Sequence, residues 1–255
     1  MRVRTTVVAA GALVLCLATG CGPDDGGEKG PGDKGPGGKA TASASPTAAA
    51  TPEADPEPVP TSDGRTLTEA ELARVALTTG ELPGYEIAPL QGAGKRGTEK
   101  PDDAACVPIT AIINGSPEPA PAATVFRTAM DTSQEGKDDR TVVTEILTSH
   151  PKGGAEELLR SVRDAVRACA DGFRTTGEDG PSTYTGVRAL PAPNAGQESF
   201  AYEVTGSLEG ARIPLVFHLV RTGSTVVTFY AADFLTDTAP EVPAALVTAQ
   251  AAKLP

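Results

Sequence analysis

The stretch Arg212–Phe234 reads RIPLVFHLVRTGSTVVTFYAADF, and its apolar pattern determines the fold that we expect. Successive side chains of a β-strand point to opposite faces of the sheet. In the first half of the stretch, one face carries only large apolar side chains: Ile213, Leu215, Phe217 and Leu219. The other face carries Val216, His218 and Val220. Because both faces are largely apolar, the pattern predicts a sheet covered by helices on one side and partly covered on the other.

The two halves of this stretch are predicted to pair as a hairpin. Strands are expected over Arg212–Arg221 and Thr225–Phe234. Thr222 and Gly223 lie between them and match a two-residue hairpin connection. Pro214 has no backbone N–H to contribute to a strand ladder, so we expect the first strand to begin at a sheet edge or a bulge.

Four more segments have the β-branched and aromatic composition that is typical of strands. They are Ala123–Met130, Arg140–Ser149, Tyr184–Leu190 and Ser199–Thr205.

Four helical segments are expected around these strands. The clearest is Ala155–Cys169, where apolar residues recur at helical spacing and charged residues occupy the opposite face. Thr68 and Glu71 form a capping box, which predicts a short helix ending near Thr78. The other two segments are Ala104–Asn114 and Glu241–Leu254.

This order of elements predicts an α+β fold, with an antiparallel sheet of about six strands and helices packed against it. The folded part is expected to be a single domain over residues 66–255, which is long enough to bury a core.

The first 20 residues are predicted to be an export signal. Arg2 and Arg4 precede an uncharged run from Val7 to Ala18, which as a helix would reach only about 18 Å of the roughly 30 Å bilayer core. Small residues at 18–20 directly precede Cys21, and this pattern resembles the lipobox of bacterial lipoproteins. The resemblance implies that Cys21 is acylated, for example with palmitate, and becomes the anchored N-terminus. The chain is thus expected on the outer face of the cytoplasmic membrane.

Residues 21–65 are predicted to be a disordered linker behind the lipidated cysteine. The segment is rich in Pro, Gly and Ala, and Val59 is its one large aliphatic residue. Such a composition cannot bury enough apolar surface to offset the entropy of ordering. The linker would hold the domain away from its anchor.

The charge of the chain restricts its partners. The formal net charge is −11 at pH 7, and no tryptophan or cluster of basic residues is present. Binding to nucleic acid depends on neutralising phosphates, so we expect no nucleic-acid partner. The membrane is expected to be contacted through the lipid anchor alone, and the acidity to serve solubility or a cationic partner.

Two cysteines remain in the predicted domain, Cys106 and Cys169. In an exported protein an even pair of cysteines indicates a disulfide. Cys169 falls on the apolar face of its helix, so a bridge to Cys106 would fasten this helix to the preceding helical segment.

Several segments together resemble the PknH-like extracellular sensor domain family of high-GC Gram-positive bacteria, whose members occur on membrane Ser/Thr kinases and as free lipoproteins. These segments are ELPGY at residues 81–85, Cys106, the helix AEELLRSVRDAVRACADGF with its late cysteine, GQESFAYEV and IPLVFHLVRTGSTVVTF. The resemblance implies an antiparallel sheet with a cleft and a ligand of unidentified chemistry, and it supplies no catalytic residues.

Three short patterns of catalytic or metal sites do not have the context that their chemistry needs. Gly92–Gly97 matches G-x-G-x-x-G but neither follows a strand nor opens a helix. Ser149 begins a Ser-x-x-Lys string that contains Pro151 and has no partner motif. The acidic run Asp131–Arg140 lacks the spacing of a calcium loop. We therefore expect no metal, no cofactor and no catalytic residues.

Three residues are candidates for ligand contact: His218, Tyr202 and Tyr230. Each lies on a predicted strand and has a polar group, although each also suits a packed core position. We therefore expect a cell-surface lipoprotein presenting a sensor-like domain that binds a small molecule or an envelope protein. The alternatives are an envelope hydrolase, or a structural or assembly-chaperone lipoprotein of the cell wall.

Overall fold

The computed structural model describes residues 64–93, 96–133, 142–208, 210–234 and 237–255. These residues belong to one unit of the chain, Pro56–Pro255. The predicted signal peptide, Cys21 and almost all of the predicted linker lie outside the described residues. Within the described ranges, the helices are too short or too polar to span a bilayer.

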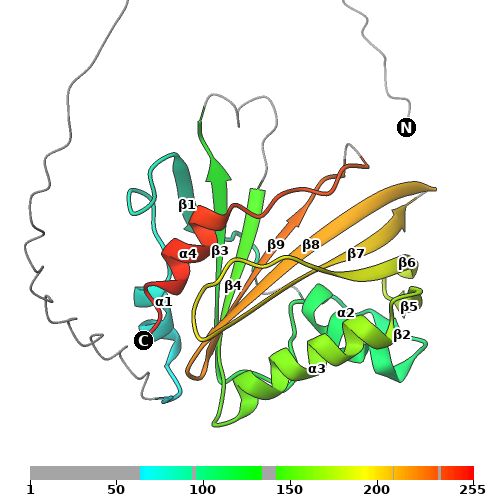
Figure 1. The fold of residues 1–255 in the computed structure, drawn as a ribbon, viewed down its shortest axis with the longest axis horizontal. Helices are drawn as coiled ribbons and strands as arrows, with labels where there is room; N and C mark the ends of the chain where they lie inside the picture. The colour runs from blue at the N-terminus through cyan, green and yellow to red at the C-terminus, as the bar shows by residue number, and fades with distance from the viewer. Residues whose placement is uncertain (1–63, 94–95, 134–141, 209, 235–236) are drawn as a thin grey trace, which may run out of the picture. The chain divides into compact units, whose positions relative to one another are not determined.

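The described strands form one antiparallel sheet in the order β1-β3-β4-β9-β8-β7-β6-β5-β2 (Figure 1). Five strands lie on the β8 side of the sheet: β8 (Ala211–Thr222), β7 (Glu198–Leu208), β6 (Gly180–Leu190), β5 (Phe173–Gly177) and β2 (Lys100–Pro101). Four lie on the β9 side: β9 (Thr225–Ala232), β4 (Val142–Ser149), β3 (Ala123–Asp131) and β1 (Tyr85–Pro89).

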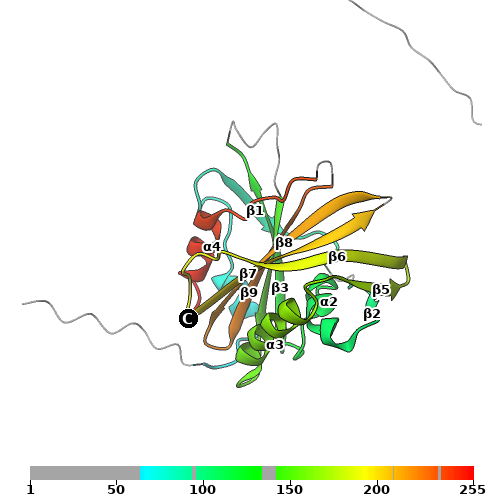
Figure 2. The same cartoon turned by 45° about the vertical axis from the view of Figure 1, so that its right-hand side comes forward.

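Two pairs of helices pack on opposite faces of this sheet (Figures 1 and 2). One face is covered by α2 (Val107–Ile113) and α3 (Gly154–Ala168), and we call it the α2/α3 face. The other is covered by α1 (Glu69–Val75) and α4 (Ala244–Ala251), and we call it the α1/α4 face. A short 3₁₀ helix, η1 (Ala104–Cys106), leads into α2.

The expected division of β8 into two apolar faces is confirmed. Its side chains on the α2/α3 face are buried with those two helices: Ile213, Leu215, Phe217 and Leu219. Val216 and Val220 are buried with α1 and α4 on the other face. Because burying one such side chain contributes about 1.5–3 kcal/mol, leaving either face bare would cost a large part of the stability of a domain.

The α+β fold with an antiparallel sheet is confirmed, but the sheet has more strands than the six expected. The additional strands β1, β2 and β5 are short, and two of them contain proline. They form because β3, β5 and β6 each offer them an open edge, which a local pattern does not reveal.

The ends of several elements differ from their predicted positions. Thr222 pairs with Thr225, so the hairpin turn consists of Gly223 and Ser224 and not of Thr222 and Gly223. Pro214 lies one residue beyond the last β8–β9 pair, Leu215 with Ala232, so its missing N–H falls where β8 is locally an edge.

The start of α1 follows its predicted signal. The backbone N–H of Thr68 donates to Glu71 at 2.9 Å and the N–H of Glu71 donates to the Thr68 hydroxyl at 3.3 Å, so the capping box is confirmed. The bond from the Thr68 backbone is the main reason that the pKa of Glu71 is lowered to about 2. The helix α1 ends at Val75, slightly before the predicted end.

The predicted disulfide is present between Cys106 and Cys169, whose Cα atoms lie 6.0 Å apart. Both cysteines are buried in the layer between the sheet and the α2/α3 helices. The bridge joins η1, at the start of α2, to the C-terminal end of α3. It therefore holds together the two helices that cover one face of the sheet.

We predict that Cys106→Ser or Cys169→Ser lowers the free energy of unfolding by about 2–5 kcal/mol, because the closed loop restricts the unfolded chain. Thermal unfolding of the full chain with and without a reductant measures the effect. Each variant should melt below the oxidised wild type and should be insensitive to the reductant. Equal melting temperatures for wild type and variants would contradict this prediction.

Candidate functional site

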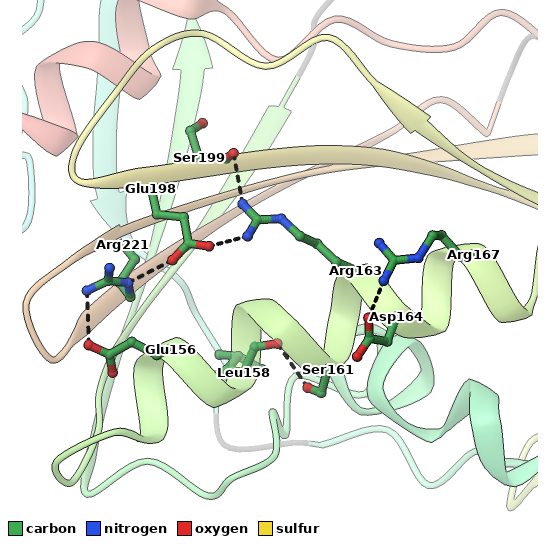
Figure 3. Close-up of polar contacts among 9 residues, drawn as sticks. All are labelled: Glu156, Leu158, Ser161, Arg163, Asp164, Arg167, Glu198, Ser199 and Arg221. Carbon is green, nitrogen blue, oxygen red and sulfur yellow. Dashed lines mark hydrogen bonds and ion pairs between the residues drawn. The ribbon is translucent and has the colours of Figure 1, made fainter.

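A network of four charged side chains lies where α3 passes the start of β7 and the end of β8, beside the β8–β9 turn (Figure 3). Glu198 forms an ion pair with Arg163 and accepts a hydrogen bond from Arg221 at 3.0 Å. Arg221 also reaches Glu156, at 3.2 Å. The network therefore alternates in charge and links one helix to two strands.

The sequence places these charges through two regular spacings. Glu156 and Arg163 are seven residues apart on α3, which is two helical turns, and therefore share one side of the helix. Glu198 begins β7 and is the register partner of Arg221 near the end of β8. The Arg163 guanidinium also lies 5.2 Å from the centre of the Phe200 ring, which favours a cation–π contact.

The network is partly shielded from water. The side chain of Arg221 is only 14% exposed, and that of Glu198 is 25% exposed. Burial acts to raise the pKa of Glu198, but the hydrogen bonds from Arg221 and Arg163 outweigh it, so that the pKa is lowered. Glu198 is thus held as a carboxylate between two guanidinium groups.

A hollow of about 500 Å³ opens beside this network. Its lining includes Lys152, Glu156, Gln197 and Arg221, together with Gly64, Gly153, Gly223 and Ser224. The Gln197 side-chain oxygen accepts from the Arg221 guanidinium and from the Gly223 N–H, both at 3.0 Å, which fixes the orientation of the amide. Cations, a carboxylate and an oriented amide converge here, and together they offer hydrogen-bond donors and acceptors to a polar ligand.

Two buried glutamates on the α1/α4 face have contrasting surroundings. Glu203 on β7 is 1% exposed and is bonded by two arginines: Arg188 of β6 forms an ion pair with it, and Arg212 of β8 donates at 2.7 Å. Its charge is therefore compensated by cations on both neighbouring strands.

Glu145 on β4 is also fully buried, but neither of its carboxylate oxygens has a hydrogen-bond partner among the described residues. Burial raises the pKa of Glu145 to about 7, against the opposing charges of Arg127 and Lys253. The side chain is thus protonated in a substantial fraction of molecules near neutral pH, unlike an ordinary glutamate.

The structure separates the three predicted ligand-contact residues. Tyr202 and Tyr230 belong to one aromatic ladder on the α2/α3 face, in which Phe217 stacks between them at ring distances of 5.0 and 5.1 Å. Tyr202 is fully buried, so it offers no surface to a ligand in this conformation. His218 is buried on the α1/α4 face, because its register partner Phe229 belongs to that core. Ligand binding by these residues stays a prediction.

The short patterns that resembled catalytic or metal motifs have structural roles or fall partly outside the described residues. The Ser149 hydroxyl is buried and accepts the Leu67 N–H at 2.7 Å, which ties the start of the domain to β4. Residues 94–95 of the glycine-rich string and 134–140 of the acidic run are not described. In the part of the chain that the structure describes, no group of three His, Cys, Asp or Glu residues is placed to hold a metal ion.

Neither the charged network nor Glu145 was identified from the sequence. The network joins residues from α3 and from two strands that lie at least 35 positions further along the chain, so it depends on the register of the sheet. Glu145 did leave a local signal, because it occupies an apolar position in the alternating pattern of Val143, Glu145 and Leu147.

No family model matches the chain, and no curated protein matches it. Among solved structures, the extracellular domain of PknH from Mycobacterium tuberculosis is similar with 12% sequence identity and a TM-score of 0.48, over 75% of this chain and 96% of that chain. LpqN, involved in cell envelope biogenesis of Mycobacterium tuberculosis, has 12% identity and a TM-score of 0.24, over 66% of this chain and 85% of that chain. Both TM-scores lie below 0.5, so membership of the PknH-like family stays a prediction.

We predict opposite effects for Glu145→Gln and Glu203→Gln. A carboxyl whose pKa is raised in the folded state stabilises the fold most below its ordinary pKa of 4.5, and this stability is lost as the pH rises to about 7. Glu145→Gln removes that loss and should raise the free energy of unfolding by about 3 kcal/mol at pH 8, with little change at pH 4.5. Glu203→Gln loses bonds to two cations and should lower it by about 1.5–3 kcal/mol at pH 8.

Urea unfolding of both variants and the wild type at pH 4.5 and pH 8 provides the measurement. Destabilisation of the Glu145 variant at pH 8 would show that the carboxylate has a partner in the folded state, contrary to the structure.

Proposed function

We propose that this chain is a cell-surface lipoprotein whose folded domain presents a binding surface outside the cytoplasmic membrane. The observation that carries the proposal is the disulfide between Cys106 and Cys169. Structural disulfides persist in oxidising compartments and are rare in the bacterial cytosol. Its presence in a chain that begins with a charged segment, an apolar run and Cys21 favours export of the domain.

Cys21 is proposed to be the anchor. Each buried acyl methylene contributes about 0.8 kcal/mol, so two or three chains on Cys21 would hold the protein firmly on a membrane. The Pro- and Gly-rich segment that follows would let the domain explore the space above the membrane surface. This arrangement suits a domain whose task is to meet a ligand or partner of the cell envelope.

The hollow beside the charged network is our proposed binding surface. Lys152 is exposed at its rim, whereas Gln197 and Arg221 are oriented by mutual hydrogen bonds. Preorganised polar groups lose little conformational entropy on binding, which favours them as a recognition surface. The occupant is proposed to be a small polar ligand or a polar segment of an envelope protein.

We further propose that the domain acts by binding and not by catalysis. The residues that a hydrolase would need are used in packing: Ser149 is buried against Leu67, and His218 is buried on the α1/α4 face. These positions give the alternative of an envelope hydrolase no support. A structural or assembly-chaperone role would use the same binding surface, with a protein as the occupant.

We predict that Cys21→Ser prevents incorporation of a labelled fatty acid and releases the protein from membranes, or leaves its signal uncleaved. Metabolic labelling followed by membrane fractionation measures both effects. Cys16→Ser is the matched control and should be labelled like the wild type. A wild-type chain that takes up no label would show that the lipoprotein assignment is wrong.

We also predict that Lys152→Glu together with Gln197→Ala weakens capture of a partner from envelope extracts by about tenfold, which corresponds to about 1.4 kcal/mol. The full chain is used as bait, and captured proteins and small molecules are quantified by mass spectrometry. Lys100→Glu is the control, because Lys100 lies on the edge strand β2 and does not line the hollow. This variant should retain capture. Equal loss with the control would place the binding surface elsewhere.

A further inference from the structure

Among the described residues, the side-chain hydrogen bonds of helix α4 and Lys253 are made to the end of α1 and to the residues just after it. The Gln250 side chain accepts the Leu77 N–H and donates to the Val75 carbonyl, both at 2.8 Å. Lys253, just after α4, donates to the Ala76 carbonyl at 2.9 Å and to Glu81 at 2.6 Å. The rest of the contact is apolar, through buried Leu246 and Val247.

Glu145 lies in the apolar layer that α1 and α4 cover. Its neighbours on the same face of β4 are Val143 and Leu147, and its register partner on β9 is Phe229. All three belong to the core that contains Leu246 and Val247. A carboxylate here is out of reach of bulk solvent and has no described donor, since the side chain is fully buried and both oxygens lack a protein partner.

The charged groups around Glu145 are engaged elsewhere. Arg127 of β3 is the register partner of Glu145 on its other side, but its guanidinium donates to the Phe126 carbonyl at 3.0 Å. Lys253 approaches from the end of α4 and is bonded to Glu81 and Ala76. His218 of β8 lies on the far side of Phe229.

The charged side chains of the covering helix α1 also lie away from Glu145. Glu69 and Arg74 are exposed, and Glu71 caps the helix start. Tyr85 of β1 also packs against this layer. Glu203 of β7 lies on the same face of the sheet and is paired with its own two arginines. Most of the other described side chains in the layer are apolar.

We propose that Glu145 makes the seating of helix α4 on the sheet dependent on protonation. A neutral carboxyl can stay buried in the apolar layer beneath α1 and α4, whereas a carboxylate without a donor is strongly destabilised there. Lifting α4 brings water to the carboxylate and also frees Lys253 to approach it. The helix is therefore firmly seated in acid and released more often at neutral pH.

The size of the effect follows from the linkage between proton binding and opening. Beneath the seated helix the pKa of Glu145 is about 7, whereas in the open state the carboxyl is hydrated and returns towards its ordinary value of 4.5. The equilibrium constant for opening then rises between these two values and levels off above pH 7. Between pH 5 and pH 7 we expect it to rise about 40-fold.

Amide hydrogen exchange of the full chain, followed by mass spectrometry from pH 5 to pH 8, tests the proposal. After correction for intrinsic exchange, the protection of peptides covering Ala244–Leu254 should fall about 40-fold between pH 5 and pH 7 in the wild type. Peptides from β8 and β9 should lose little, because the opening is local. Glu145→Gln and Glu145→Leu should both retain protection of α4 across the range. Glu203→Gln, on the same face, should keep the wild-type dependence on pH.

Several results would overturn the proposal. These are a flat pH profile of the wild-type helix, an unchanged profile in both Glu145 variants, and an equal loss of protection throughout the sheet, which would indicate global unfolding. A direct titration of the Glu145 side-chain carboxyl carbon by NMR keeps the test decisive if a variant folds poorly. A midpoint near 4.5 in the folded wild type would also contradict it.

Discussion

The rest of the structure depends on one constraint: strands β8 and β9 carry apolar side chains on both faces, so neither face can be left in water. Phe217 and Leu219 need α2 and α3, while Val220 and Phe229 need α1 and α4. The chain meets both demands by placing its helices before and after the central strands in sequence. The disulfide then links η1 and α3 on one face, whereas α4 on the other depends on apolar packing, Gln250 and Lys253.

The two buried glutamates of the α1/α4 face differ in how their charge is compensated. Glu145 on β4 and Glu203 on β7 are separated by the two strands of the central hairpin, β9 and β8. Only Glu203 is paired with arginines on both of its neighbouring strands. The ion pairs of Glu203 compensate its buried charge. Glu145 has no donor, so its ionised form destabilises the fold. Local partners, and not burial as such, therefore decide whether a carboxylate supports this fold or weakens it.

Sequence patterns predicted those parts of the fold that depend on local periodicity. The two faces of β8, the amphipathic helix α3 and the capping box at Thr68 follow from residues that are neighbours in sequence. The cysteine pair was predicted because only two thiols remained. The short strands β1, β2 and β5 form only on edges that other strands supply, and the charged network needs the pairing of Glu198 with Arg221. Likewise, only the strand register shows that His218 lies on the other face of the sheet from Tyr202 and Tyr230.

The start of the domain forms part of the proposed binding hollow. Gly64 and Ser224 line the hollow, and the Ser224 hydroxyl donates to the Arg65 carbonyl next in sequence to Gly64. Thr66 and Leu67 are bonded to His150 and Ser149 at the end of β4, close to the start of α3. A ligand bound in the hollow would therefore contact the segment through which a membrane anchor at Cys21 holds the domain. Binding in the proposed hollow would therefore act on the same hydrogen bonds that tie the start of the domain to the sheet.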